Sequence, residues 1–162
     1  MPRWLDVPRD LLRRVTATVK NAERATGRTT RRKEPPTRPV DTGVRVEYTP
    51  ALDGDPDPGE VVWTWVPYEE DPTLGKDRPV IIIGRHGPLL SGVALTTKHG
   101  ERVDHVEVGT GPWDSQGRPS YAKVDRLLDI DPAEVRREGA ILGRRRFDAV
   151  IEAVDRLHDV AR

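Results

Sequence analysis

The stretch GKDRPVIII, from Gly75 to Ile83, is the key to the fold of this 162-residue chain. Its second half is the most apolar run in the sequence, and successive Val and Ile residues are typical of a strand that is buried on both faces. Charged residues stand directly before that run. Because Pro79 fixes the backbone where the two halves meet, we expect Arg78 to be held in place directly before a buried strand.

Short strands separated by turns are predicted on both sides of this stretch. Residues 60–66 alternate, which places Val61, Trp63 and Trp65 on one face, as core or dimer-interface residues. Turns are predicted at residues 50–59, 85–87 and 109–120. Strands are predicted at residues 44–48, 60–66, 80–84, 89–96, 102–108 and 121–125. This pattern favours a mainly β fold of the α+β class, built as a small antiparallel barrel or sandwich.

Helices are predicted near both ends of the chain. Residues 144–160 carry an apolar stripe at helical spacing, which is expected to cover one end or one open face of the barrel. The stripe consists of Phe147, Val150, Ile151, Val154 and Leu157. Asp131 is followed three residues later by Glu134, which predicts a short helix start. Residues 8–25 predict an N-terminal helix and residues 27–40 an Arg- and Pro-rich linker. We therefore divide the chain into residues 1–43 and a barrel domain at residues 44–162.

The net charge is zero, but the positive charge is concentrated at the N-terminus. Residues 1–40 hold eleven Lys or Arg against four acids, and the remainder holds sixteen against twenty-three. Such a segment can attract nucleic acid by releasing counterions. A solvated arm explains the same pattern, and so does an arm that docks on the chain's own acidic surface as an autoinhibitor.

The composition argues against several classes of protein. Cysteine is absent, which excludes disulfides and thiolate metal sites. The four histidines are scattered and no Gly-rich phosphate loop is present, so neither a metal nor a cofactor is expected. No apolar run approaches the roughly 20 residues that span a membrane, and the N-terminus lacks a secretory segment. A cytoplasmic protein is the simplest expectation.

Polar residues at three predicted strand ends suggest chemistry on a phosphodiester. Arg78 can hold two phosphate oxygens and stabilise a pentacoordinate transition state, and a hydroxyl of the pair Thr96-Thr97 can donate to a third. Lys123 and Asp125 share one face of their strand. Each signal alone is also that of an ordinary surface residue, and His99 is either an acid or base or a solvated loop residue. If the substrate is RNA, its 2′-OH supplies the nucleophile, and the protein need only position it and stabilise charge.

The order of these motifs resembles the PemK/MazF family of toxins from bacterial toxin–antitoxin systems. The likeness runs over about residues 57–157, from GEVVW at residues 59–63 through GKDRPVII at residues 75–82 to Leu95-Thr96-Thr97 and Val124-Asp125. The resemblance implies an SH3-like small β-barrel with a C-terminal helix, usually a homodimer. It also implies metal-independent cleavage of single-stranded RNA, with 2′,3′-cyclic phosphate and 5′-OH ends, and an antitoxin protein as partner.

The family's functional residues carry over to matching positions. Arg78, Thr96 and Asp125 are then catalytic, Asp125 by orienting Arg78, Lys123 or a ribose hydroxyl. The expected substrate-binding residues are Lys76, Thr97, Lys98, Lys123 and Tyr68, the last by stacking on an RNA base.

This sequence departs from the family in the loop before Arg78. Many members carry an Asp-Pro-Thr turn close to the preceding strand, where this chain has Pro67-Tyr68-Glu69-Glu70. The loop is therefore acidic. A module of the same fold that binds RNA or another partner without cutting is the alternative, because a fold does not guarantee activity.

Overall fold

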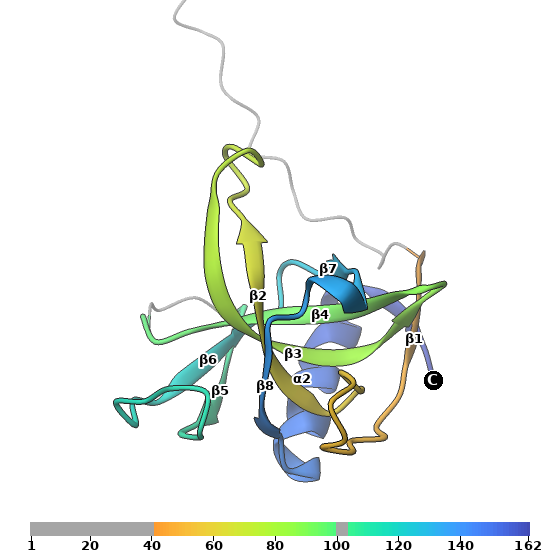
Figure 1. The fold of residues 1–162 in the computed structure, drawn as a ribbon. Helices are drawn as coiled ribbons and strands as arrows, with labels where there is room; N and C mark the ends of the chain where they lie inside the picture. Colours follow the sequence, from red (N-terminus) through yellow and green to blue (C-terminus); the bar gives the residue numbers. More distant parts are fainter. Residues whose placement is uncertain (1–40, 100–103) are drawn as a thin grey trace, which may run out of the picture. The chain divides into compact units, whose positions relative to one another are not determined.

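The computed structural model describes residues 41–99 and 104–162, which form a curled, mostly β structure with one α-helix (Figure 1). The strands are β1 Asp41–Val46, β2 Glu60–Pro67, β3 Gly75–His86, β4 Leu89–Thr96, β5 His105–Gly109, β6 Ser120–Lys123, β7 Leu128–Ile130, β8 Arg137–Ile141 and β9 Asp159–Ala161. The helices are the 3-10 helix η1 Pro132–Glu134 and the α-helix α2 Arg144–Leu157. The predicted fold class, mainly β with a C-terminal helix, is confirmed. The helix and linker predicted before residue 41 lie outside the described residues.

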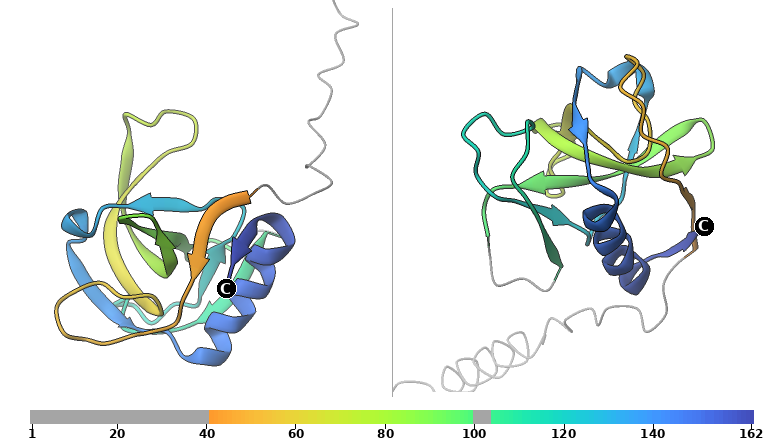
Figure 2. Two further views of the ribbon diagram at one scale, coloured as in Figure 1. Left: turned by 90° about the vertical axis from the view of Figure 1, so that its right-hand side faces the viewer. Right: turned by 90° about the horizontal axis from the view of Figure 1, so that it is seen from below.

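Strand β3 is the centre of the sheet, which runs β5-β6-β4-β3-β1-β9. The first half of β3 pairs with β2, from Pro67 opposite Gly75 to Val61 opposite Ile81, and its second half pairs with β4. β2 also pairs with β8, and β4 with β7, so the sheet curls instead of lying flat. α2 lies along one side of the curled sheet in both views of Figure 2.

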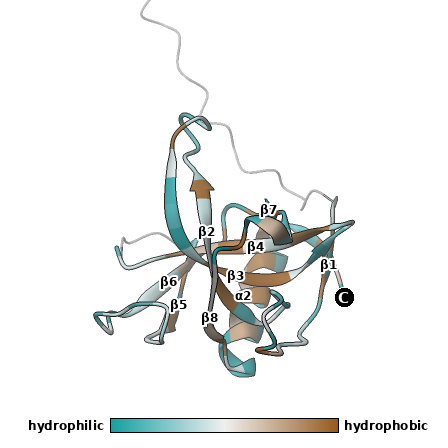
Figure 3. Cartoon of the chain, viewed as in Figure 1, coloured by the Kyte–Doolittle hydropathy of each residue, from teal (hydrophilic) through white to brown (hydrophobic). Residues whose placement is uncertain are grey.

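The core is divided between the two faces of the sheet. Val80, Ile81, Ile82 and Ile83 are all fully buried. Ile81 and Ile83 pack in the cluster that contains the buried face of α2, whereas Val80 and Ile82 pack with residues of β2, β4 and β7. Figure 3 shows β3 changing from hydrophilic to hydrophobic along its length. The buried half therefore fixes the direction of the strand, and the polar half projects from the core as one arm of a hairpin with β2.

Several boundaries differ from the sequence predictions. The strand predicted at residues 89–96 is confirmed, but the turn predicted at residues 85–87 is wrong. Arg85 and His86 still belong to β3, where they pair with Leu90 and Leu89. The chain turns at Gly87, whose φ of 58° suits glycine.

Strands β7, β8 and β9 were not predicted. They are only three to five residues long, too short for a pattern to be recognised, and they become strands by pairing with β4, β2 and β1. The predicted start at Asp131 is confirmed: its Oδ1 accepts a hydrogen bond of 2.9 Å from the Ala133 amide and caps η1. Within α2 the apolar stripe is buried, except that Leu157 is 41% exposed.

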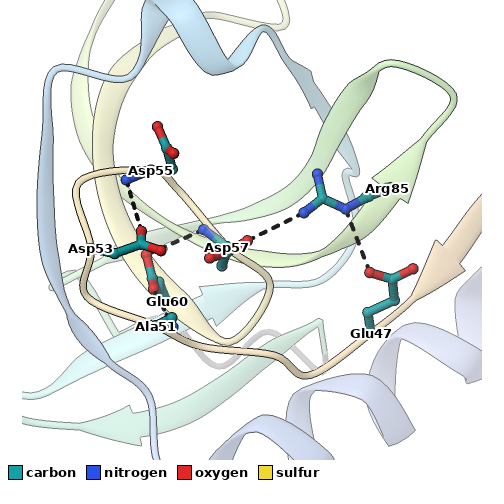
Figure 4. A network of polar contacts seen from close by, with 7 residues as sticks. All are labelled: Glu47, Ala51, Asp53, Asp55, Asp57, Glu60 and Arg85. Atoms are coloured by element: carbon teal, nitrogen blue, oxygen red, sulfur yellow. Dashed lines mark hydrogen bonds and ion pairs between the residues drawn. The ribbon is translucent and has the colours of Figure 1, made fainter.

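A buried carboxylate holds the acidic loop between β1 and β2 (Figure 4). Glu60 is fully buried, and its two oxygens accept hydrogen bonds from the amides of Ala51, at 2.8 Å, and Asp57, at 3.2 Å. Arg85 then bridges Asp57 and Glu47, at 3.2 and 3.5 Å. A buried charge needs such partners, so these contacts explain how so acidic a loop is fixed against the sheet.

The β2–β3 hairpin is tight where its loop ends, because of Gly75. A Cβ on this residue would lie 2.4 Å from the Val66 carbonyl oxygen and 2.6 Å from the Trp65 ring. Trp65 itself is 42% exposed, so it is not a core residue of the single chain. At the tip of the hairpin, the amide and hydroxyl of Thr73 both donate to Asp71 Oδ1, which closes the turn.

Candidate functional site

A hollow of about 340 Å³ opens where the polar half of β3 meets the end of β4. We call it the first hollow. Six of the eight residues that the sequence singled out line it: Lys76, Arg78, Thr96, Thr97, Lys98 and Lys123. The other lining residues are Trp63, Asp77, Pro79, Leu95, His105, Trp113, Asp114, Arg118 and Ser120. The predicted site residues are thus largely brought together, although they are spread over β3, β4 and β6.

Strand register explains why Arg78 and Thr96 meet. Val80 pairs with Ala94 and Ile81 with Val93. Continuing that antiparallel register by two residues places Arg78 opposite Thr96, and both line the first hollow. On the other side of β4, Thr96 pairs with Tyr121, two residues before Lys123. The paired halves of β3 and β4 therefore lead Arg78 and Thr96 to the same hollow.

The acids in the first hollow are already paired. Asp77 accepts a hydrogen bond of 3.0 Å from Arg136. Both nitrogens Nε and Nη2 of Arg118 donate to Asp114, at 3.1 and 2.8 Å, and these bonds lower the pKa of Asp114 to about 2. The remaining cations of the first hollow therefore have no unpaired acid among its lining residues.

The unbalanced charge comes mainly from lysines. Residues 41–162 contain three lysines, at positions 76, 98 and 123, and all of them line the first hollow. The pKa of Lys76 is lowered, first by repulsion from Arg78, then by burial, and then by Lys98. Like charges that repel each other in the free protein favour an anionic ligand with several charges, such as a phosphodiester chain.

A second hollow of about 250 Å³ lies beside the first. Arg78 and Lys123 line both hollows, so they stand on the boundary between them. Tyr68, the remaining predicted substrate-binding residue, lines the second hollow and is 37% exposed. Its other lining residues are Val66, Pro67, Glu69, Glu70, Ala94, Arg126 and Leu128.

Asp125 is the one predicted site residue that lines neither hollow. Its pKa is raised, first by burial and then by the nearby carboxylate of Asp104, while Lys123 acts in the opposite direction. Its Oδ1 atom is buried and has no hydrogen-bond partner among the described residues. Asp125 is therefore close to Lys123 but behind the surface that a ligand meets.

Two residues of the first hollow escaped the sequence analysis. Arg118 lies in a long loop, and only its bidentate pairing with Asp114 holds it at the hollow. His105 pairs with Lys123 across β5 and β6, and both of its ring nitrogens are buried without a hydrogen-bond partner in the described part of the chain. Neither position lies in a local motif that would have pointed to it.

Residues 41–99 and 104–162 lack two other kinds of feature. These residues contain no group of three or more His, Cys, Asp or Glu side chains arranged to hold a metal ion. None of their helices is long and apolar enough to cross a membrane.

The family of the chain follows from a sequence comparison. Residues 57–158 match the family model described as PemK-like, MazF-like toxin of type II toxin–antitoxin system. The chain belongs to this family. The match includes β2 to α2, and thus every residue that lines the two hollows. No curated protein matches the chain in sequence.

Solved structures of MazF proteins are similar in fold. MazF of Deinococcus radiodurans is 19% identical, with a TM-score of 0.51 over 65% of this chain and 97% of that one. The toxin MazF-mt6 of Mycobacterium tuberculosis is 18% identical, with a TM-score of 0.47 over 62% of this chain and 98% of that one. An endoribonuclease from a mycobacterial species, solved in complex with its cognate antitoxin, is 17% identical, with a TM-score of 0.49 over 63% and 93%. The likeness to the Deinococcus protein supports the MazF fold for residues 41–162.

Proposed function

We propose that this chain is an endoribonuclease toxin that cuts single-stranded RNA without a metal ion, by attack of the ribose 2′-OH on the adjacent phosphorus. The observation that carries the proposal is the convergence of Arg78, Thr96 and three lysines on one hollow whose acids are already paired. Family membership adds support, because a structure similar in fold is that of an endoribonuclease.

Arg78 and Thr96 hold the scissile phosphate. The guanidinium is held before a buried strand, so it can stabilise charge on the phosphorane without reorganising. The Thr96 hydroxyl donates to a remaining phosphate oxygen, while Thr97 and the lysines bind the neighbouring backbone. As the 2′-oxygen attacks, the bond from phosphorus to the 5′-oxygen breaks, which leaves a 2′,3′-cyclic phosphate and a 5′-hydroxyl.

Two protons must move during this step. An arginine side chain does not lose its proton at neutral pH, so Arg78 serves as a charge stabiliser. Water takes the proton from the 2′-OH, because both ring nitrogens of His105, which lines the same hollow, are buried away from a ligand. The leaving 5′-oxygen takes a proton from water. Asp125 acts through Lys123, which it orients from behind.

The proposal extends to partners and location. A cognate antitoxin is expected, because structures of related toxins include a complex with one. A homodimer is expected from the resemblance, and an exposed Trp65 gives such a contact an apolar residue. We expect the protein to act in the cytoplasm, where its RNA substrate lies.

The proposal is tested with a DNA strand that contains a single ribonucleotide. The full chain, treated with EDTA, is expected to cut only after that ribonucleotide and to leave a cyclic phosphate, identified by mass spectrometry. Cutting at deoxynucleotides, or only when a divalent metal is added, would contradict the mechanism. Binding of the RNA without cutting would instead favour a non-catalytic module on the same fold.

A further inference from the structure

The second hollow has the lining of a pocket for a flat, uncharged ring. Its floor comes from Val66, Ala94 and Leu128, which are 5%, 8% and 8% exposed and belong to the second core cluster. Tyr68 provides an aromatic wall. Small-molecule pockets generally combine such an apolar surface with a few polar groups that fix orientation, and aromatic walls stack nucleobases.

The second hollow carries both signs of charge, with three cations, two of them shared with the first hollow, and two carboxylates. Glu69 and Glu70 line it, both are exposed, and neither has a hydrogen bond or ion pair with a described residue. Arg126, on the same hollow, donates a 2.8 Å hydrogen bond to the Pro67 carbonyl and so braces the hairpin. Arg78 and Lys123 attract a phosphate to the boundary with the first hollow, whereas the two carboxylates repel a phosphate beside them and do not repel an uncharged base.

Carboxylates also distinguish among the four bases. An ionised carboxylate only accepts hydrogen bonds, and its two oxygens suit two parallel donors. Guanine presents two such donors, N1–H and N2–H, on its Watson–Crick edge. Adenine and cytosine present one amino group beside an acceptor nitrogen, and uracil presents one N–H between two carbonyls. An RNA base whose edge is exposed in a single strand is read in this way.

We infer that the second hollow is a guanine-selective subsite, in which Tyr68 stacks on the base and Glu69 or Glu70 accepts from its N1–H and N2–H. The inference rests on the proposed function for its substrate, since it assumes an RNA whose phosphate lies at Arg78. Because Arg78 and Lys123 line both hollows, the guanosine is the nucleotide next to the scissile phosphate. The acidic loop, which departs from the family pattern, then sets sequence preference instead of weakening RNA binding.

The test measures binding separately from cutting. Short 2′-O-methyl oligonucleotides with one guanosine, inosine or adenosine in a uridine background are bound to the full chain and followed by fluorescence anisotropy. Inosine lacks the N2 amino group and keeps the rest of the guanine edge. We expect about tenfold tighter binding of the guanosine strand than of the inosine strand, equivalent to one lost bond of a bidentate pair.

Two double variants separate recognition from charge. Glu69→Ala/Glu70→Ala is expected to abolish the preference for guanosine over inosine. Asp53→Ala/Asp55→Ala removes two acids from another exposed loop, outside both hollows. This variant is expected to keep the preference for guanosine over inosine. Equal binding of the guanosine and inosine strands by the wild type would overturn the inference, as would a preference that survives in Glu69→Ala/Glu70→Ala.

The outcome is independent of the proposed chemistry. A guanosine preference without cutting of the matching ribonucleotide strand would uphold the subsite and refute the nuclease. Cutting with no preference for guanosine would uphold the nuclease and refute the subsite. Failure to bind any of the strands would refute both.

Discussion

Replacing Lys76 with methionine tests whether the first hollow binds a chain of phosphates. Lys76 is exposed and its positive charge is opposed by Arg78 and Lys98. Its removal relieves that repulsion, so the free energy of unfolding should change by less than about 0.5 kcal/mol, as at other surface positions. RNA binding, in contrast, loses one cation that faces the backbone.

The size of the effect follows from counterion release. Each phosphate neutralised on a single strand contributes about 0.7 to the slope of log K against log salt concentration. Lys76→Met should therefore reduce that slope by about 0.7. When the salt concentration rises from 50 to 200 mM, the loss of RNA affinity should then be about 2.6-fold smaller in the variant than in the wild type. The difference between variants is the useful quantity, because residues 1–40 hold eleven further Lys and Arg.

The assay is fluorescence anisotropy of a 2′-O-methyl oligonucleotide over a series of KCl concentrations. Arg156→Met is the matched control, since Arg156 is an exposed cation on α2 outside both hollows. Its slope should equal that of the wild type. A Lys76→Met slope that is unchanged, or a control slope that falls equally, would refute the assignment of the first hollow as the phosphate site.

Three further predictions concern titratable groups. NMR titration should give a pKa of about 2 for Asp114, returning towards 3.8 in Arg118→Ala; an unchanged value in the variant would exclude the pairing. Because burial raises the folded-state pKa of Asp125, stability is lost as pH rises from the unfolded value through the folded one. Asp125→Asn should therefore raise the melting temperature at pH 7 and leave it unchanged at pH 3, which thermal scans can check. Because both ring nitrogens of His105 are buried, a folded His105→Gln variant should cut RNA at the wild-type rate, whereas a loss of about 100-fold would assign His105 a general-base role.

The central strands could be predicted because their own residues determine them. The residues Val80 to Ile83 are all apolar, so they favour a buried strand in any fold. Leu89–Thr96 follows as a second apolar strand, with a glycine turn between the two. The apolar stripe of α2 is likewise determined by the helix's own residues. Strand β8 has no such signal: it is a strand because Glu60 to Trp63 of β2 offer it a free edge.

The positions of the candidate site residues could be foreseen where strand register follows from sequence, but not where loops decide. Arg78 and Thr96 flank buried strands that pair in order, so their meeting could be foreseen. Arg118 reaches the hollow only through the turn that Asp114 stabilises, by accepting from the Arg118 amide at 2.7 Å. Alternation predicts Asp125 on the face of Lys123, but β6 ends at Lys123, so alternation does not tell how far the Asp125 side chain lies from a hollow.

The most direct test of the nuclease compares wild type with Arg78→Ala and Arg78→Lys on single-stranded RNA in EDTA. Circular dichroism and melting temperature should be similar in all three, because Arg78 is outside both core clusters. The account predicts that Arg78→Ala lowers the rate by 100-fold or more, about the cost of losing one donor to a developing oxyanion. Arg78→Lys should recover only part of it, since lysine lacks the bidentate fork. Equal cutting by wild type and a folded Arg78→Ala would contradict the account.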